Sequence, residues 1–254
     1  MSLQMLLFIA YIWLAIAIVV HITMFYITAP FGRHTSGKWG LMVNNKVGWV
    51  VMECPSLLLM LYFLFWGESS FQSNVWILFV LWITHYVNRS LIYPARIKST
   101  PKKMPLFIVL SAIFFNLVNA GLNGYYLSVF ASVKDYDASW FHTPHFIIGI
   151  TLFIAGMAIN WKSDNMLIHL RKQGETGYKI PQGFLFDFIS SPNLFGEIVE
   201  WTGFAIMAWN LPAFTFMVWT FANLVPRAKN HHDWYLNQFS NYPKNRKIVF
   251  PFIF

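Results

Sequence analysis

Long apolar runs recur along this chain of 254 residues, and they constrain its fold more than any other feature. A helix of about twenty residues crosses the hydrocarbon core of a lipid bilayer. The chain has 57% hydrophobic and 11% charged residues, whereas roughly 25% of the residues in an ordinary soluble domain are charged. We therefore predict an all-α, polytopic membrane protein with seven transmembrane helices. The predicted spans are about Met5–Ile27, Val47–Trp66, Val75–Tyr93, Leu106–Leu127, Phe146–Trp161, Phe195–Asn210 and Ala213–Leu224.

The lysines and arginines fall almost entirely on one side of these spans. The loops after the first, third and fifth spans and the C-terminal tail contain all but two of the 18, the exceptions being Lys134 and Arg89. Because positively charged loops stay in the cytosol, the N-terminus is predicted outside and the C-terminus in the cytosol. The net charge of +8 then belongs to cytosolic loops and does not indicate a nucleic-acid partner.

The longest polar passage, Asn160–Trp201, lies between two apolar runs on the predicted cytosolic side. It holds five of the ten carboxylates, and Glu197 and Glu200 are three residues apart, which places both on one face of a helix. Carboxylates that enter a membrane helix are costly, so they are candidates for function. A solvated loop followed by an acidic helix start would explain the same pattern without any site.

The second and third predicted spans each contain a polar residue that is a candidate for chemistry. Glu53 comes just before Cys54 and Pro55, and Tyr86 is near the end of the third span. The loop between these spans is short, so the helices should be antiparallel neighbours with both residues at similar depth. Glu53 either pairs with Arg89 or a histidine to join two helices, or stays neutral and donates a hydrogen bond to a substrate oxygen. Tyr86 is equally open to a structural interpretation, because buried tyrosines usually find a partner for the hydroxyl.

Three asparagines, Asn116, Asn119 and Asn123, lie on one face of the fourth predicted span. Rows of this kind more often join membrane helices than bind a ligand. The sequence has no G-x-G-x-x-G fingerprint, and its helical pattern excludes a doubly wound dinucleotide-binding sheet. Its eight histidines are scattered, so no metal site is predicted.

Five passages have the order and spacing of one known family and together span nearly the whole chain. They are MECPS (52–56), THYVNRSLIYP (84–94), NGYYL (123–127), the segment 156–205 that begins GMAINWKSDN, and the segment 227–254 that ends in PFIF. In these passages the chain resembles the steroid 5-alpha-reductase family, the 3-oxo-5-alpha-steroid 4-dehydrogenases. The resemblance implies a seven-helix membrane enzyme that uses NADPH to saturate the 4,5 double bond of a 3-oxo-4-ene steroid, by hydride transfer to C5.

The resemblance also implies roles for individual residues. Glu53 and Tyr86 match the pair that holds the steroid 3-keto oxygen. Two residues depart from the family pattern: Met52 replaces a glutamine, and Lys179 replaces an arginine, which keeps the charge but loses the bidentate fork for a phosphate. The positions that match the NADPH site are Asn160, Asp164, Arg171, Tyr178, Lys179, Asn193, Glu197, Arg227, His231 and Tyr235.

We expect a single membrane-embedded reductase domain over residues 1–254. Its substrate-pocket helices would lie in about 1–127 and its cofactor-binding part in about 146–254. Arg171, Lys172 and Arg227 are suited to neutralise the cofactor phosphates. The protein is expected to be a monomer that binds a steroid and membrane lipid but no nucleic acid. Its location would be the inner membrane in a bacterium or the endoplasmic reticulum membrane in a eukaryote.

Other membrane proteins remain as alternatives. An enoyl-CoA or polyprenol reductase has a similar C-terminal half, and an apolar pocket discriminates weakly among lipids. An isoprenylcysteine-type methyltransferase has no need of a Glu–Tyr pair at a carbonyl. A transporter usually has paired repeats and broken helices, whereas the polarity here is gathered on one face.

Overall fold

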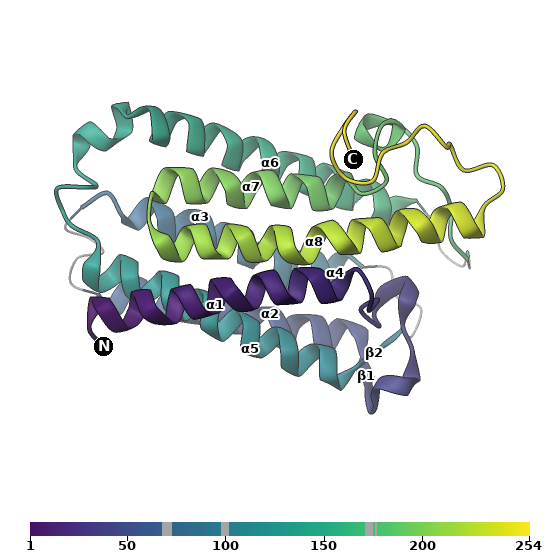
Figure 1. Ribbon diagram of the computed structural model, residues 1–254, viewed down its shortest axis with the longest axis horizontal. Helices are drawn as coiled ribbons and strands as arrows, with labels where there is room; N and C mark the ends of the chain where they lie inside the picture. Colours follow the sequence, from purple (N-terminus) through teal and green to yellow (C-terminus); the bar gives the residue numbers. More distant parts are fainter. Residues whose placement is uncertain (68–72, 98–101, 171–174, 176) are drawn as a thin grey trace. The chain divides into compact units, whose positions relative to one another are not determined.

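The structure is a computed structural model that describes residues 1–67, 73–97, 102–170, 175 and 177–254, and it is mostly helical, as predicted (Figure 1). Two short strands, β1 (Met42–Asn44) and β2 (Lys103–Pro105), pair antiparallel with Val43 opposite Met104. The all-α prediction did not include this pairing, which joins the segments that lead into α2 and α5. The helices are α1 (Leu3–Met24), α2 (Asn45–Trp66), α3 (Trp76–Val87), α4 (Tyr93–Arg96), α5 (Leu106–Tyr125), α6 (Pro144–His169), α7 (Pro192–Ala208) and α8 (Leu211–Gln238).

Four of the described helical segments are long and apolar enough to cross a membrane. They correspond to the first, second, fourth and fifth predicted spans. The third predicted span is divided among α3, a π-helical turn at Asn88–Ile92 and α4. Seven crossings and their orientation therefore stay a prediction. The four segments are Leu3–Met24, Asn45–Trp66, Leu106–Phe130 and Pro144–His169.

Two helices extend beyond the ends of their predicted spans. The α6 helix continues past Trp161 to His169, so the polar passage begins inside a helix. The α8 helix continues past Leu224 and through Pro226 to Gln238. Hydropathy indicates how far a helix can lie in lipid, but the backbone hydrogen bonds of a helix continue into polar sequence without interruption. This explains why both helices are longer than their apolar runs.

The helix starts carry residues that favour them. Asn44 Oδ1 accepts hydrogen bonds from two backbone N–H groups in the first turn of α2, at 2.9 and 3.3 Å. Asn210 Oδ1 accepts one from the first turn of α8, at 3.0 Å. Side-chain oxygens at these positions satisfy N–H groups that have no partner within the helix. Pro144 and Pro192 are the first residues of α6 and α7, where the missing N–H is not needed.

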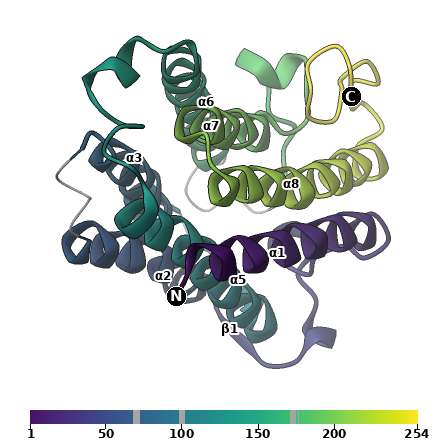
Figure 2. The same ribbon diagram turned by 60° about the vertical axis from the view of Figure 1, so that its left-hand side comes forward.

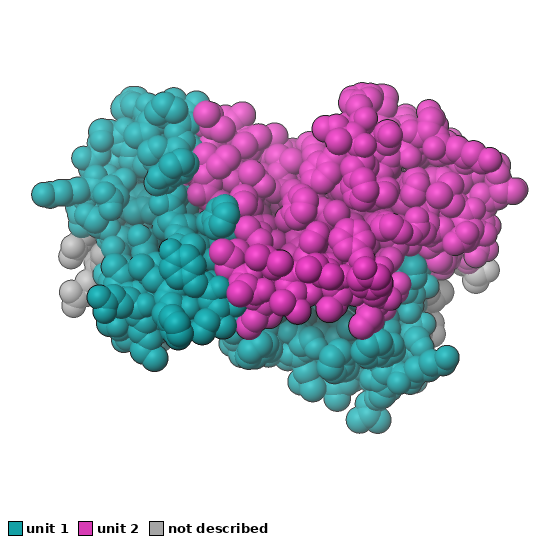
Figure 3. Space-filling view, in the orientation of Figure 1, with its two compact units in different colours: residues 1–13, 29–147, 208–215 teal, residues 14–28, 148–207, 216–254 magenta. Residues whose placement is uncertain are grey.

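The chain forms two compact units, each assembled from three separate stretches (Figure 3). Unit 1 comprises residues 1–13, 29–147 and 208–215, and unit 2 comprises residues 14–28, 148–207 and 216–254. In unit 1, α2 packs along α5 and next to α3 (Figure 2). Gly124 of α5 lies directly against Phe63 of α2, so a Cβ atom at this position would overlap the phenyl ring.

In unit 2, α6 and α7 approach each other through two pairs of glycines. Gly149 lies against Gly203, and Gly156 lies against Gly196. A Cβ atom on any of the four would overlap backbone atoms of the other helix. The glycines of each helix are two turns apart, so both pairs lie along one line of contact. Small residues at such positions let two membrane helices touch through their backbones.

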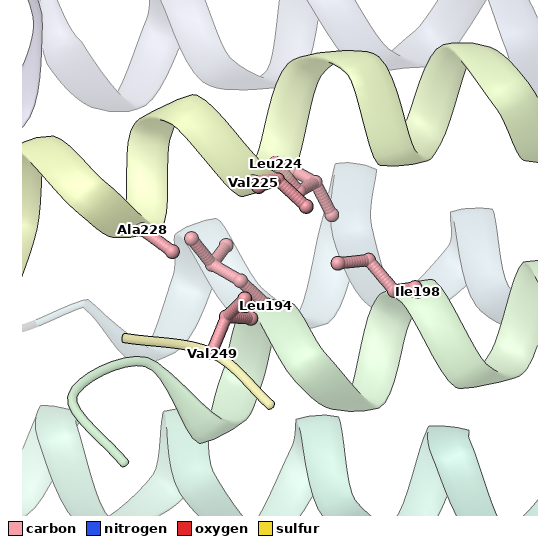
Figure 4. Packing of buried hydrophobic residues seen from close by; sticks show 6 residues of the cluster. All are labelled: Leu194, Ile198, Leu224, Val225, Ala228 and Val249. Atoms are coloured by element: carbon pink, nitrogen blue, oxygen red, sulfur yellow. The ribbon is translucent and has the colours of Figure 1, made fainter. Parts of the chain in front are cut away.

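The α7 helix also packs against α8 in unit 2 through a cluster of buried aliphatic side chains (Figure 4). The C-terminal segment contributes to this cluster and is held beside it by backbone hydrogen bonds. The Lys247 N–H donates to Phe188 O at 2.8 Å, and the Ser190 N–H donates to Lys247 O at 2.9 Å. The end of the chain is thus anchored within unit 2. The cluster consists of Leu194, Ile198, Leu224, Val225, Ala228 and Val249.

Candidate active site

In unit 1, Glu53 of α2 and Tyr86 of α3 contact the same side chain, Asn116 of α5. The Tyr86 hydroxyl donates to Asn116 Oδ1 at 3.3 Å, and Asn116 Nδ2 lies 3.4 Å from Glu53 Oε2 and 2.7 Å from Met52 O. Tyr86 and Asn116 are buried, and Glu53 is half-buried. The prediction that the two helices are neighbours is confirmed. The structure therefore brings both predicted carbonyl-binding residues into one hydrogen-bonded cluster.

The ring of Tyr86 is held by aromatic neighbours on its own helix. It stacks on Trp82 with the ring centroids 5.6 Å apart, and it forms a T-shaped contact with His85 with the centroids 5.1 Å apart. Trp82 is itself fixed, because its indole N–H donates to Ser56 Oγ of α2 at 3.0 Å. These contacts restrict the orientation of the phenol and direct its hydroxyl toward α5.

The segment after Tyr86 is a π-helical turn that is attached to α2. The indole N–H of Trp49 donates to Arg89 O at 3.0 Å. The Arg89 guanidinium lies over the rings of Trp49 and Tyr93, 5.1 and 5.5 Å from their centroids. Cation–π contacts of this kind stabilise a charged side chain in apolar surroundings. Single π-helical turns occur frequently at functional sites, and this one begins two residues after Tyr86.

The other two asparagines of α5 have packing roles, as predicted. Asn119 Oδ1 accepts from the indole N–H of Trp13 at 3.1 Å. Asn123 Nδ2 donates to Asn119 O at 3.0 Å and to Pro212 O at 3.3 Å. None of these three hydrogen bonds involves Glu53 or Tyr86. Asn116 therefore differs from its two neighbours on the same helix face.

In unit 2, three of the predicted cofactor residues form a second polar cluster. Asn160 Nδ2 donates to Asn193 O at 3.0 Å, and Asn193 Nδ2 donates to Asp164 Oδ1 at 3.0 Å. Asn160 and Asp164 are buried side chains of α6, and Asn193 is the second residue of α7. The contact between Gly156 and Gly196, one turn away on each helix, brings the two backbones together at this point.

Several buried polar atoms in this region have no hydrogen-bond partner among the residues that the structure describes. Asn160 Oδ1 and the hydroxyls of Ser163 and Ser191 are buried and make no hydrogen bond within the described part of the chain. Buried polar atoms nearly always have partners, so each exception needs an explanation. A bound molecule with hydroxyl or amide groups would satisfy these atoms.

A stripe on α8 carries three more of the predicted cofactor residues. Arg227, His231 and Tyr235 are four residues apart and therefore share one face of the helix. Arg227 and His231 are half-buried, and Tyr235 is buried. Leu194, which follows Asn193, belongs to the same apolar cluster as Ala228, which follows Arg227. The start of α7 and this part of α8 are thus in contact.

A hydrogen-bonded hub beside this stripe was not predicted from the sequence. Ser190 Oγ lies 2.6 Å from His232 Nδ1, 2.7 Å from the Tyr242 hydroxyl and 3.2 Å from Lys247 O. The Tyr242 ring stacks on Tyr235 with centroids 5.0 Å apart and planes 4° apart. The hub therefore joins the segment before α7, the α8 helix and the C-terminal segment. Through Tyr242 it also packs against the ring of Tyr235.

The imidazole of His232 in the hub is partly buried, and this changes its pKa. Burial lowers the pKa of His232 from its ordinary value of 6.5. The Asp233 carboxylate opposes this change in the pKa, and the Lys229 ammonium reinforces it. Lys229 and Asp233 also pair with each other at 2.6 Å. The adjacent histidines at 231 and 232 were the only signal in the sequence, and they gave no indication of Ser190 as a partner.

Two further predicted residues lie at the surface of unit 2. The ring of Tyr178 meets the ring of Trp234 edge to face, with centroids 4.8 Å apart. Lys179 pairs with Glu175 at 2.6 Å, and both side chains are substantially exposed. An exposed ion pair of this kind contributes little to stability, so a ligand can replace it at small cost.

The remaining predicted residues differ in what the structure shows of them. Glu197 is half-buried on α7, one turn after Asn193. Glu200 is fully buried where Gly156 of α6 lies against its backbone. Arg171 and Lys172 lie outside the described residues.

Polar clusters inside both units, on helices of which several can span a membrane, define a helical membrane protein with buried polar sites. The family model of the 3-oxo-5-alpha-steroid 4-dehydrogenases matches residues 102–254. The chain is 41% identical to a steroid 5-alpha-reductase DET2 of Solanum lycopersicum, over 97% of this chain and 96% of that protein. It is 40% identical to a 3-oxo-5-alpha-steroid 4-dehydrogenase 1 of Bos taurus, over 96% and 95% of the two chains.

The corresponding protein of Homo sapiens is 43% identical over 88% of this chain and 86% of its own length. The chain therefore belongs to the 3-oxo-5-alpha-steroid 4-dehydrogenase family, the steroid 5-alpha-reductases. It is an oxidoreductase, and membership of this family implies a nicotinamide cofactor.

Proposed function

We propose that this protein reduces the 4,5 double bond of a 3-oxo-4-ene steroid to the 5-alpha-reduced 3-oxo steroid, with NADPH as the reductant. The relatives are named steroid 5-alpha-reductase and 3-oxo-5-alpha-steroid 4-dehydrogenase, and these names support the proposed steroid reduction. The observation that carries it to this chain is the cluster of Glu53, Tyr86 and Asn116 among apolar helices. A reductase of this kind needs hydrogen-bond donors at the ketone, and Glu53 in its neutral form and Tyr86 both qualify.

The chemistry explains why donors at the C3 oxygen matter. Bound NADPH supplies the hydride that adds to C5 of the steroid. The addition moves the electron pair of the 4,5 double bond toward C3, and negative charge builds on the C3 oxygen. Hydrogen bonds from Glu53 and Tyr86 to that oxygen stabilise this charge and lower the barrier. A proton taken up at C4 completes the reaction, so the steroid gains one hydride and one proton.

Residues of unit 2 are suited to hold the cofactor. The oxygens of Asn160, Ser163 and Ser191 that lack a partner in the described part of the chain accept hydrogen bonds from hydroxyl and amide groups, which a nicotinamide dinucleotide carries. Arg171, Lys172 and Arg227 would neutralise its phosphates, and the additional phosphate of NADPH favours it over NADH. The proposed set also includes Asp164, Tyr178, Lys179, Asn193, Glu197, His231 and Tyr235.

This assignment keeps the substrate part in about residues 1–127 and the cofactor part in about residues 146–254. Glu53 and Tyr86 lie in unit 1, and the proposed cofactor residues lie in unit 2. The test is to incubate the purified protein with a panel of 3-oxo-4-ene steroids and either NADPH or NADH, and to follow the products by mass spectrometry. We expect 5-alpha-reduced products with NADPH and much slower reduction with NADH.

Deuterium on the transferred position of NADPH should appear at C5 of the product. Reduction of polyprenols or enoyl-CoA, with no product from any steroid, would contradict the proposed substrate. Equal rates with NADH and NADPH would contradict the proposed cofactor and leave the substrate assignment intact.

We further propose that the chain crosses the membrane seven times with its N-terminus outside. The support is the one-sided distribution of lysine and arginine, together with four described helices of spanning length. Single cysteines at Ser2 and Lys244, in a background without Cys54, should react with an impermeant reagent from opposite sides. Labelling of both from the same side would exclude an odd number of crossings. The membrane would be the bacterial inner membrane or the endoplasmic reticulum membrane, according to the source.

A further inference from the structure

We propose that Asn116 is a positioning residue of the carbonyl site, whose amide sets which oxygen of Glu53 donates and where the Tyr86 hydroxyl points. This inference rests on the proposed function, because it concerns the same two donors. Asn116 was expected to be a packing residue like Asn119 and Asn123. The structure instead places it between the two residues that would bind the steroid ketone.

The orientation of the Asn116 amide is fixed by a backbone carbonyl. Met52 O can only accept a hydrogen bond, and it lies 2.7 Å from one end of the amide. That end must therefore be the NH₂ group, and the other end must be the carbonyl oxygen. The Tyr86 hydroxyl, 3.3 Å from this oxygen, is then the donor of the bond between them. One backbone contact thus determines the direction of both side-chain hydrogen bonds.

The second hydrogen of the same NH₂ group points to Glu53. It lies on the nitrogen that is 3.4 Å from Glu53 Oε2, so Oε2 is held as an acceptor. A neutral carboxyl group has one accepting and one donating oxygen. Because Oε2 faces a donor, the proton of neutral Glu53 is placed on Oε1. Asn116 therefore holds Oε2 as the accepting oxygen and assigns the proton of neutral Glu53 to Oε1.

The Tyr86 hydroxyl has a single hydrogen, which points to the Asn116 oxygen. A neutral ketone and an amide oxygen are comparable acceptors, so the hydroxyl gains little when it turns to the ground-state substrate. An oxygen with developing negative charge is a much stronger acceptor, because charge-assisted hydrogen bonds are about twice as strong as neutral ones. When the Tyr86 hydroxyl turns from the Asn116 oxygen to the steroid oxygen, the transition state is stabilised more than the bound substrate. This raises kcat more than it lowers KM.

Two substitutions test this arrangement. Asn116→Leu keeps a similar volume but removes the amide, and we expect kcat to fall by about tenfold or more, with the KM values for steroid and NADPH changed much less. Asn119→Leu is the matched control, because Asn119 lies one turn away on the same face and bonds to Trp13. We expect it to lower thermal stability and to keep the kcat of the folded enzyme.

Asn116→Asp gives a readout that a packing role would not change. The introduced carboxyl must be protonated to donate to Met52 O as the amide does. When it ionises, it places a negative charge beside Glu53 and the developing charge of the steroid oxygen. The ratio of variant to wild-type kcat should therefore fall as the pH is raised across the range in which both proteins stay folded.

The outcomes separate this inference from the proposed function. If Glu53→Ala and Tyr86→Phe abolish most steroid reduction while Asn116→Leu keeps kcat within about twofold, the positioning role is wrong and the donor pair stands. A kcat ratio for Asn116→Asp that does not change with pH would also overturn the positioning role. If Glu53→Ala and Tyr86→Phe are themselves near normal, the donor pair fails, and the role of Asn116 fails with it.

Discussion

The polar clusters of the two units are built in different ways. In unit 1, Glu53, Tyr86 and Asn116 come from three separate helices and meet through their side chains. In unit 2, Asn160 is bonded to the backbone carbonyl of Asn193, at a place where α6 and α7 touch through glycines. The first cluster depends on which side chains three helices present. The second contains one side-chain pair, Asn193 with Asp164, but its bond from Asn160 to a backbone carbonyl depends on how closely the two helix backbones approach.

Because of this difference, the two clusters should respond to different kinds of substitution. One side chain can be removed from the unit 1 cluster by substitution while all three helices stay in place. The geometry of the unit 2 cluster is instead set by residues such as Gly156 that have no polar side chain at all. Substitutions in unit 1 should therefore change chemistry, and substitutions at the glycines of unit 2 should change stability and cofactor binding.

The largest effect is expected from loss of a donor in unit 1. Glu53→Ala should raise the barrier to steroid reduction by on the order of 3 kcal/mol, about a hundredfold in kcat, as for other donors at a developing negative charge. Glu53→Gln keeps an N–H donor and should retain more activity. Tyr86→Phe should lower kcat as well. Steady-state kinetics with each variant, together with direct measurement of NADPH binding, will check these expectations.

NADPH binding should be unchanged in all three variants, since the proposed cofactor residues lie in unit 2. Near-normal turnover by both Glu53→Ala and Tyr86→Phe would show that the ketone is held elsewhere. Weaker NADPH binding by these variants, with unchanged turnover at saturation, would show that the unit 1 cluster binds the cofactor and not the ketone.

A smaller effect is expected from Gly156→Ala in unit 2. The added Cβ would overlap the backbone of Gly196 and Glu200, which cannot move aside as a flexible side chain can. Overpacking of this kind typically lowers the free energy of unfolding by about 1–3 kcal/mol. Because Asn160 and Asn193 lie one turn from the contact, NADPH should also bind more weakly. Thermal unfolding in detergent, with and without NADPH, measures both effects.

The matched control is Gly121→Ala on α5, where a Cβ would meet no other atom within 4 Å. Alanine favours a helix over glycine by about 1 kcal/mol, so this variant should be as stable as the wild type or more stable. Equal stability of the Gly156→Ala and Gly121→Ala variants would mean that the α6–α7 contact does not fix the second cluster.

The helices were predictable because apolar runs of spanning length have few alternatives. The prediction placed the spans that became α1, α2, α5 and α6 within a few residues of their observed starts. It ended α6 and α8 too early. Hydropathy identifies only the apolar part of a helix, and these two helices continue through polar residues such as Asp164 and Arg227. The π-helical turn after α3 has no distinctive composition, and nothing in the sequence indicated it.

Candidate site residues were selected from the sequence either by a conspicuous residue type or by the resemblance to a family, and their roles stay predictions. Glu53 was selected because it is a lone carboxyl in an apolar run, and Tyr86 was selected because of the resemblance to a family. Asn116 was grouped with its neighbours, because the spacing of a row does not show which member faces another polar group. Ser190 and Tyr242 are separated by 52 residues, and no local pattern predicts a contact over that distance.

The smallest effect is expected from the hub in unit 2, and it should depend on pH. His232 bonds to Ser190, and burial lowers the pKa of His232 in the folded protein below the 6.5 of an ordinary histidine. As the pH falls through 6.5, the unfolded chain takes up a proton at His232 that the folded protein does not. The free energy of unfolding should therefore decrease below this pH. Above it, His232 is neutral in both states, and its contribution to the free energy of unfolding is fully present.

His232→Gln removes the titrating group, so its stability should change less between pH 7.5 and pH 5.5, values chosen about one unit on either side of the ordinary histidine pKa. Tyr242→Phe is the control, because it removes a hydroxyl from the same hub and leaves the imidazole in place. This variant should be less stable at both pH values and should keep the wild-type pH dependence. Chemical unfolding at the two pH values will distinguish them. If the wild type and His232→Gln lose the same stability on acidification, other groups account for the acid sensitivity of unit 2.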